Sequence, residues 1–275
     1  MQRIIVTGAT SMIGVALIEE CIKHGTEVYA VVREGSKKRS RLPESSLIKF
    51  ADCSLEHLDR LPEMISQECD TFYHIAWGNT GENRNSSTEL QSRNIGYTLA
   101  AVKAAAALGC KRFIGAGSQA EYGLLDLDRI SPESAANPTT PYGAAKLASG
   151  YLARMLCKEL GIECIWPRIF SVYGIYEKET TMIASGLRKM LAGEPTEFTP
   201  GMQRWEYLFS ADAGRAFLSY WRKRTGRSRV LRRKRTACAA SGLYTENGRA
   251  YRLQESGDRS QTISQRRCNE PLRRY

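Results

Sequence analysis

The sequence predicts an α/β protein built on a doubly wound parallel sheet. Three observations lead to this fold class: short apolar runs alternate with Ala-rich or Leu-rich helical stretches, the first run leads into a glycine loop, and an amphipathic segment follows that loop through Ile22. Helices that alternate with strands in this way cover both faces of a parallel sheet. Ligands of such sheets bind beyond the carboxyl ends of the strands, where the strand order reverses.

Six apolar runs are predicted as strands, because each carries β-branched or aromatic residues that favour extended backbone. In chain order they are 4–6, 27–32, 47–50, 71–75, 112–115 and 163–166. The first is Ile-Ile-Val, the second holds three valines, the third and fifth pair isoleucine with phenylalanine, the fourth joins Phe to Tyr, and the sixth ends in Ile-Trp. Helices are expected between most of them, including two long ones at about 89–108 and 142–160.

The net charge of +11 is concentrated at the C-terminal end of the chain. Residues 222–275 hold 16 of the 40 Lys and Arg residues but only 4 of the 29 Asp and Glu residues, so that 1–221 is nearly neutral. This basic tail has few apolar residues and no periodicity, which predicts a disordered segment. Two interpretations of it stay open: an arm that binds polyanions or a membrane surface, and a reading-frame change, which its unpatterned composition favours. Nucleic-acid binding by the main body is not expected.

Composition excludes several other classes. The 8 cysteines are scattered without a Cys-x-x-Cys pair and the 3 histidines lie apart from them, so we expect neither a metal site nor a disulfide framework. No segment approaches the roughly 18 apolar residues that a membrane span needs. The N-terminus runs straight into a strand rather than into a signal peptide, which predicts a cytoplasmic protein.

The loop after the first strand, Thr7-Gly8-Ala-Thr-Ser11-Met-Ile-Gly14, indicates dinucleotide binding. Gly8 permits a tight turn, and Gly14 permits close packing of the following helix on the strand. The N-terminus of that helix offers free N–H groups and a positive dipole to a pyrophosphate. Ser11 stands where the three-glycine version of this loop has its central glycine.

The end of the second strand selects between the two nicotinamide dinucleotides. An acidic residue there holds the ribose 2′-hydroxyl of NAD, whereas an arginine accommodates the 2′-phosphate of NADP. This chain has Arg33, followed by four further basic residues between 37 and 41. We therefore expect NADP as the cofactor, with NAD as the alternative.

Tyr142 and Lys146 stand four residues apart on a predicted helix, so that they share one face. A free phenol has a pKa of about 10, and a fixed cation nearby favours the phenolate and lowers it. The pair therefore suits proton transfer, although the spacing alone also arises by chance on exposed helices. Ser118 follows the fifth strand in Gly115-Ala-Gly-Ser-Gln-Ala-Glu-Tyr-Gly, a position beside the ligand end of the sheet.

With these motifs in order over residues 1–221, the chain resembles the extended short-chain dehydrogenase/reductase family, in its nucleotide-sugar epimerase/dehydratase branch. The resemblance implies a Rossmann-type sheet in 1–165 and a small, incomplete substrate lobe in 166–221, followed by the basic tail 222–275. It implies that Tyr142 transfers a proton at the sugar, that Lys146 lowers its pKa and holds the nicotinamide ribose, and that Ser118 hydrogen-bonds the reacting oxygen. Asn94 matches the helix asparagine of the catalytic tetrad.

The motifs also imply which residues hold the cofactor, Asp52 as the acid that contacts adenine among them. The expected set is Gly8, Thr10, Ser11, Met12, Ile13, Gly14, Arg33, Asp52, Cys53, Ala76, Trp77, Tyr142 and Lys146. For the substrate, the expected contacts are Ser118, Tyr173 and Arg204. The same resemblance implies a homodimer that pairs through the two long helices.

Two departures narrow the implied chemistry. Dehydratases of this branch have an Asp-Glu pair after the serine or threonine, and this chain has Gln119-Ala120, so we do not expect elimination. Ser171 replaces an asparagine that is common on the substrate side. The leading expectation is 4-keto reduction of a nucleotide-activated sugar, which suits Arg33 because NADPH supplies net hydride. The alternatives are a nucleotide-sugar 4-epimerase and a non-catalytic dinucleotide-binding or sensing protein.

Overall fold

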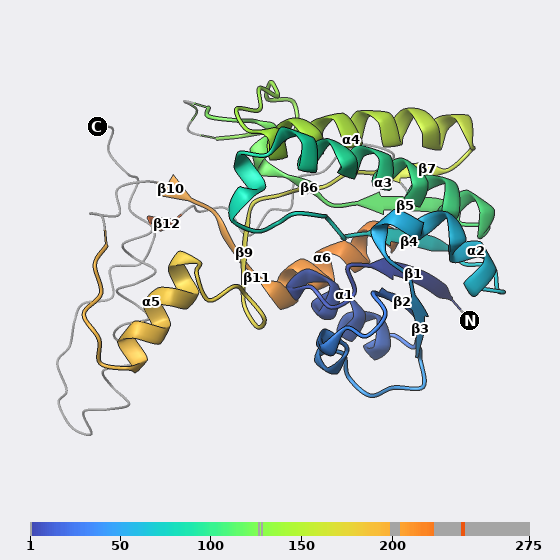
Figure 1. Ribbon diagram of the computed structural model, residues 1–275, viewed down its shortest axis with the longest axis horizontal. Coiled ribbons are helices and arrows are strands. Elements are labelled where there is room, and N and C mark those ends of the chain that lie inside the picture. Colours follow the sequence, from blue (N-terminus) through green and yellow to red (C-terminus); the bar gives the residue numbers. More distant parts are fainter. Residues whose placement is uncertain (1, 126, 128, 199–203, 223–237, 240–275) are drawn as a thin grey trace. The chain divides into compact units, whose positions relative to one another are not determined.

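The computed structural model of the protein describes residues 2–125, 127, 129–198, 204–222 and 238–239 (Figure 1). These residues fall into two compact units, one formed by 2–174 with 209–222 and the other by 175–208 with 238–239. The larger unit contains the sheet. Among the described residues, no helix combines the length and the hydrophobicity that a membrane crossing requires.

The larger unit is built on a parallel sheet of six strands, in the order β3-β2-β1-β4-β5-β7. The strands are β1 (Arg3–Thr7), β2 (Glu27–Val32), β3 (Ile48–Asp52), β4 (Thr71–His74), β5 (Arg112–Gly115) and β7 (Glu163–Ile165). Every pair of neighbours in the sheet is parallel. The predicted Rossmann-type fold is confirmed, and each strand end lies within two residues of its prediction. Strand order reverses between β1 and β4, which places the ligand end of the sheet beyond Thr7 and His74.

Helices cover both faces of this sheet (Figure 1). On one face lie α3 (Thr88–Ala107) and α4 (Pro141–Glu159), with the short α2 (Leu61–Met64) beside α3; on the other lie α1 (Met12–Lys23) and α6 (Ser210–Arg222). Successive side chains of β4 point to opposite faces of the sheet. Phe72 packs in the core on the side of α3 and α4, while the Tyr73 hydroxyl donates to the Phe217 carbonyl of α6 at 3.4 Å. Alanines on α3 allow that helix to approach the sheet closely.

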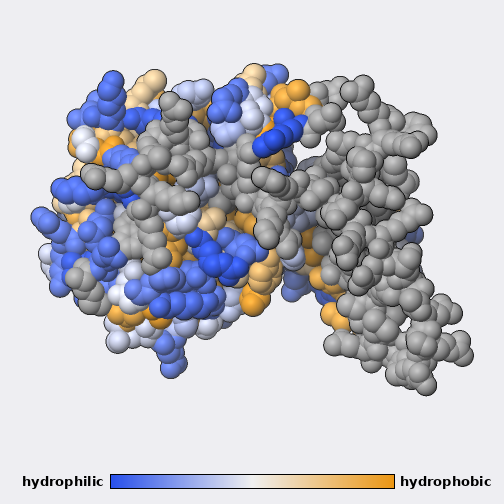
Figure 2. All heavy atoms as spheres, turned by 180° about the vertical axis from the view of Figure 1, so that it is seen from behind, coloured by the Kyte–Doolittle hydropathy of each residue, from blue (hydrophilic) through white to orange (hydrophobic). Residues whose placement is uncertain are grey.

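Short elements complete the larger unit. They are the 3₁₀ turns η1 (Lys37–Arg41), η2 (Leu55–Arg60), η3 (Glu82–Asn85) and η4 (Gln119–Glu121), and the strands β6 (Gly117–Ser118), β8 (Arg168–Ile169) and β9 (Ser171–Tyr173). β6 pairs in parallel with β8, so the segment that carries Ser118 is fixed by a second small sheet. On the face drawn in Figure 2, hydrophilic residues cover much of the described surface and hydrophobic ones form separate patches.

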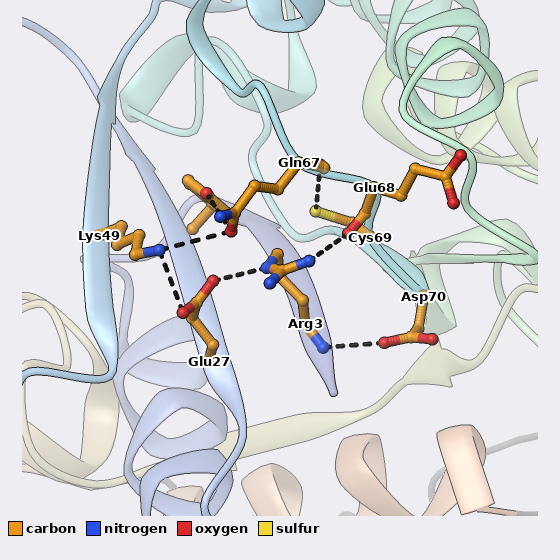
Figure 3. A network of polar contacts seen from close by, with 8 residues as sticks. Arg3, Glu27, Lys49, Gln67, Glu68, Cys69 and Asp70 are labelled. Atoms are coloured by element: carbon orange, nitrogen blue, oxygen red, sulfur yellow. Dashed lines mark hydrogen bonds and ion pairs between the residues drawn. The ribbon is translucent and has the colours of Figure 1, made fainter. Parts of the chain in front are cut away.

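A polar network ties the amino ends of the strands together (Figure 3). The Arg3 guanidinium of β1 donates to Glu27 of β2 at 2.6 Å, and Lys49 of β3 reaches the other oxygen of the same carboxylate at 3.1 Å. The backbone N–H of Arg3 donates to Asp70, just before β4, at 2.8 Å. Four neighbouring strands are thus joined at the end of the sheet opposite the ligand end.

The second unit contains α5 (Met182–Leu191) and β10 (Arg204–Trp205), and the last part of β11 (Tyr207–Phe209) returns the chain to the first unit. β10 pairs antiparallel with β12 (Cys238–Ala239). Within the predicted disordered or frame-shifted tail, these two residues therefore form a strand, and 223–237 and 240–275 lie outside the described residues. The division into a sheet domain, a partial lobe and a tail stays a prediction.

Candidate active site

The glycine loop forms a close turn at the ligand end of β1. Gly8 has a positive φ of 69°, and a Cβ there would lie 2.6 Å from the backbone nitrogen of Ala76, which follows β4. A Cβ on Gly14 would lie 2.8 Å from the Ala9 carbonyl oxygen, so this position also requires glycine. The loop, the start of α1 and the end of β4 therefore converge as a dinucleotide cradle demands.

Ser11 departs from glycine for a local reason. It is the N-cap of α1, and its hydroxyl accepts a hydrogen bond from the Gly14 N–H at 3.1 Å. Its own N–H donates to the Gly8 carbonyl at 2.9 Å, which closes the turn. The first turn of α1 carries no acidic residue, so nothing there opposes an anion at the positive end of the helix.

The predicted adenosine end of the site carries charge contacts that the motifs did not indicate. Arg33 is exposed just after β2, and its contact with the cofactor stays a prediction. The Arg39 guanidinium donates to Asp52 at 2.7 Å and lies 4.2 Å from the centre of the Phe50 ring. The Arg41 guanidinium donates to the Thr10 carbonyl at 3.3 Å and so contacts the glycine loop directly. Buried Cys53 donates its thiol hydrogen to the His57 carbonyl at 3.1 Å.

Tyr142 and Lys146 do share one face of α4, as predicted. The helix begins at Pro141, and its N-cap Thr140 accepts from the Gly143 N–H at 3.1 Å. Lys146 is only 3% exposed, and its Nζ lies 5.9 Å from the centre of the Tyr142 ring. The ammonium donates to the Ala116 carbonyl at 2.6 Å, which fixes it beneath the segment that leads to Ser118.

Trp77 lies between these two side chains. The Lys146 Nζ is 3.6 Å from the centre of the Trp77 ring, and the Trp77 and Tyr142 rings meet edge to face with centres 6.0 Å apart. The indole N–H donates to Gln91 of α3 at 2.8 Å. Gln91, which the sequence did not single out, therefore orients the aromatic ring on which the lysine rests.

Burial shifts the pKa values of both groups. Burial raises the pKa of Tyr142 above its usual value, although a hydrogen bond with Ser118 and the charge of Arg84 act against that rise. Burial also lowers the pKa of Lys146 to about 7, with the Glu121 carboxylate opposing the change.

Ser118 is positioned by a buried ion pair that sequence reasoning missed. The Glu121 carboxylate is 1% exposed, accepts from the Ser118 N–H at 2.8 Å and forms a 2.7 Å ion pair with Arg168 of β8. It also accepts from the Trp166 indole at 3.0 Å. The Ser118 hydroxyl accepts from the Ala120 N–H at 3.2 Å, which makes it the cap of η4. The Glu121 carboxylate and the Arg168 guanidinium come from positions 47 residues apart in sequence, so only the fold brings them together.

Asn94 lies on α3 and holds the loop after β4. Its side-chain oxygen accepts from the Gly78 N–H at 2.7 Å, and its amide nitrogen donates to the Gly78 carbonyl at 3.2 Å. These contacts position the segment that carries Trp77. A direct catalytic role for Asn94 stays a prediction.

The geometry does not test the predicted substrate contacts Tyr173 and Arg204. Tyr173 is partly buried, and its ring centre lies 5.6 Å from that of Phe209. Arg204 lies in β10, and its side chain is outside the described part of the structure. The described residues contain no group of three or more His, Cys, Asp or Glu that could hold a metal ion.

Known proteins resemble this chain over most of its length. The model of the NAD dependent epimerase/dehydratase family matches residues 4–230. UDP-glucose 4-epimerase of Streptomyces lividans is 23% identical over 242 residues, which cover 82% of this chain and 74% of that protein. The dTDP-6-deoxy-L-talose 4-dehydrogenase (NAD(+)) of Aggregatibacter actinomycetemcomitans is 28% identical over 145 residues, 53% of this chain and 52% of its own.

Among solved structures, UDP-glucuronic acid 4-epimerase from Bacillus cereus in complex with NAD has the same fold. Its TM-score is 0.73 at 21% sequence identity, with 85% of this chain and 78% of that chain covered. The likeness at this level of identity concerns the fold, and it includes the parallel sheet and the two helical layers described above.

Proposed function

Because the chain belongs to the NAD dependent epimerase/dehydratase family, we propose that it reduces a keto group at carbon 4 of a nucleotide-activated sugar. The observation that carries this proposal is the arrangement of Ser118, Tyr142 and Lys146 beside the glycine loop. The Ser118 hydroxyl acts to lower the pKa of the Tyr142 phenol, and the lysine lies one helical turn away from that tyrosine. Two polar hydrogens can therefore converge on one substrate oxygen.

The roles of the side chains follow from their chemistry. The Ser118 hydroxyl and the Tyr142 phenol donate hydrogen bonds to the oxygen on which negative charge develops, and the phenol then gives up its proton to it. A raised pKa keeps the phenol protonated and ready to act as the acid. A nicotinamide cofactor in the glycine cradle would supply the hydride. Gln119 and Ala120, in place of two acids, offer no carboxylate for elimination.

The choice of cofactor is part of the proposal. NADP is supported by Arg33 and the basic turn η1, since no acid ends β2. NAD, the alternative, is supported by the name of the family, by the NAD(+)-dependent dehydrogenase relative and by the solved epimerase complex with NAD. Isothermal titration calorimetry with NADPH and with NADH decides between the two cofactors. Tighter binding of NADPH that is lost in Arg33→Ala supports NADP. Equal or tighter binding of NADH refutes the preference for NADP.

A second candidate reaction is epimerisation at carbon 4, which the names of two of the similar proteins favour. Two incubations of the purified protein separate the two reactions, one with NADPH and a 4-keto nucleotide sugar, the other with a 4-hydroxy nucleotide sugar. Loss of the NADPH absorbance together with formation of the 4-hydroxy sugar indicates reduction. Interconversion of 4-hydroxy epimers without net cofactor consumption indicates an epimerase.

A homodimer that pairs through α3 and α4 belongs to the same proposal. Tyr151, Leu152 and Met155 of α4 expose 49%, 39% and 58% of their surface, an apolar exposure that a second copy would cover. Sedimentation velocity over a range of concentrations measures the assembly. Met155→Lys should shift the protein to the monomer, while Glu19→Lys, on α1 at the other face of the sheet, should not. A wild-type protein that stays monomeric at every concentration contradicts the dimer.

A further inference from the structure

The connection between β4 and α3 is bound by two amide side chains that lie about one turn apart on α3. Asn94 binds both backbone groups of Gly78, as described above. Gln91 accepts from the Trp77 indole N–H at 2.8 Å and donates to the Asn79 carbonyl, also at 2.8 Å. Three consecutive residues of the connection are therefore each hydrogen-bonded to α3.

The orientation of the Gln91 amide follows from its two partners. An indole N–H can only donate and a backbone carbonyl can only accept, so the amide oxygen faces Trp77 and the amide nitrogen faces Asn79. Gln91 is 0% exposed, and this arrangement satisfies both ends of its amide. Because the indole is bound at its N–H, rotation of the Trp77 ring would leave a buried acceptor without a donor. The amide thus fixes the orientation of the ring.

The face of this ring contacts the ammonium of Lys146. The Lys146 Nζ lies 3.6 Å from the centre of the Trp77 ring and donates to the Ala116 carbonyl at 2.6 Å. The lysine is 3% exposed, and the attraction between a cation and an aromatic face is stronger where water is excluded. A lysine side chain has many rotamers, so its position depends on such contacts. A change in the orientation of the indole would therefore free the ammonium on one side.

The two amides of α3 act on different parts of the connection. The Asn94 amide binds backbone groups, and its oxygen would lie 3.1 Å from a Cβ on Gly78, so this residue fixes the path of the chain. Gln91 also binds a side chain, that of Trp77, whose ring contacts Lys146 and the edge of the Tyr142 ring. Fixing the path of the chain does not require a bond to the indole, and that bond points to the lysine.

We propose that Gln91 is a positioning residue, which acts through Trp77 to place the Lys146 ammonium for the nicotinamide ribose. The inference rests on the proposed function and on the expected role of Lys146 as the group that binds that ribose. Loss of the hydrogen bond between Gln91 and the indole should leave the glycine cradle intact. It should weaken only the binding of the nicotinamide half of the cofactor.

Nuclear magnetic resonance of Lys146 tests this placement without any cofactor. In protein that contains carbon-13 lysine, the ε-methylene signal of Lys146 is the one missing from Lys146→Met, and it should lie upfield because Nζ is over the Trp77 ring. Gln91→Met should move this signal downfield, toward those of exposed lysines, and Trp77→Leu should abolish the upfield shift. Gln91→Glu still offers the indole an acceptor and should keep most of the shift. Ser92→Ala, on the exposed side of α3, is the matched control and should change nothing.

Isothermal titration calorimetry measures the consequence for the cofactor. Gln91→Met should weaken the binding of NADPH or NADH, whichever the wild type prefers, about threefold to tenfold, the effect of one hydrogen bond. The affinity for ADP, which lacks the nicotinamide ribose, should stay the same. In a Trp77→Leu background, Gln91→Met should cause no further loss, because the ring through which it acts is absent. If Gln91→Met does not fold, Trp77→Phe breaks the same hydrogen bond, keeps an aromatic ring and takes its place in both measurements.

An unchanged Lys146 signal in Gln91→Met overturns the inference. An equal loss of affinity for ADP and for the dinucleotide also overturns it, because the amide would then support the cradle as a whole. The same holds for a loss that is equally large with and without the Trp77 ring. The Lys146 signal needs no cofactor, so failure of the proposed function, seen as wild-type protein that binds neither dinucleotide, is distinguishable from failure of this inference.

Discussion

At the scale of single residues, the sequence placed the two predicted proton-transfer side chains on one helix face but did not indicate their burial. The i, i+4 spacing placed Tyr142 and Lys146 on one face, and the helix of the structure confirms that placement. Their pKa values depend on burial beneath Trp77 and Ala116, which come from other elements. Desolvation of the lysine could therefore not be predicted from the spacing.

The first prediction concerns the phenol itself. Tyr142→Phe removes only the phenolic hydroxyl that we propose as the proton donor, so we expect kcat for keto reduction to fall by about 100-fold or more, while dinucleotide affinity changes little. Steady-state kinetics and cofactor titration measure the two effects. Tyr151→Phe, an exposed tyrosine of the same helix, is the matched control and should keep wild-type kcat. An unaltered kcat in Tyr142→Phe would assign the proton transfer to another group.

At the scale of elements, the helices and strands were predictable, whereas the side-chain contacts between different elements were not. Periodicity and strand-forming residues located all six strands of the main sheet and the long helices α3 and α4. The pairing of Glu121 with Arg168 joins η4 to β8, and the contact of Arg41 with Thr10 joins η1 to the glycine loop. Such contacts need the tertiary fold, because no local pattern specifies a partner tens of residues away. Ser11 shows the opposite case, since an N-cap serine before an apolar run is a local signal.

The second prediction tests the ion pair of Glu121 and Arg168 beside Ser118. Glu121→Gln leaves the Arg168 guanidinium buried without a counter-charge, and we expect it to lower the free energy of unfolding by about 3 kcal/mol. Urea denaturation measures this change. Arg168→Met in the Glu121→Gln background should restore part of the loss, because the unpaired charge is then removed. Glu63→Gln, in an exposed pair with Arg60, should cost little. Equal stability of Glu121→Gln and wild type would show that the pair contributes no net stability.

At the scale of the whole molecule, stabilising charge and reactive charge lie at opposite ends of one sheet. The network of Arg3, Glu27 and Lys49 joins the amino ends of the strands (Figure 3). Ser118, by contrast, follows the carboxyl end of β5, and Tyr142 lies in the first turn of α4. Parallel sheets separate the two ends in this way because the loops that follow the strands all lie at the same edge of the sheet. Changes in the network should therefore alter stability without altering the site.

The last prediction uses that separation. Burial favours the neutral form of Glu27, yet the hydrogen bonds and charges of Arg3 and Lys49 prevail and hold its pKa below the usual value. A depressed folded-state pKa stabilises the protein above the unfolded-state pKa, and that contribution disappears as the pH falls through the folded-state pKa. Glu27→Gln should thus lower the free energy of unfolding on the order of 1 kcal/mol at neutral pH, and the difference from wild type should shrink in acid below about pH 4.

Denaturation by urea at a series of pH values measures this convergence, and dinucleotide affinity at neutral pH should be the same in both proteins. The wild type should lose stability on acidification more steeply than Glu27→Gln, because only the wild type takes up the additional proton at this carboxylate on unfolding. Parallel curves over the acid range would mean that Glu27 is protonated equally in the folded and unfolded chains. In that case Arg3 and Lys49 would join the strands through Gln67, Glu68 and Asp70 rather than through the charge of Glu27.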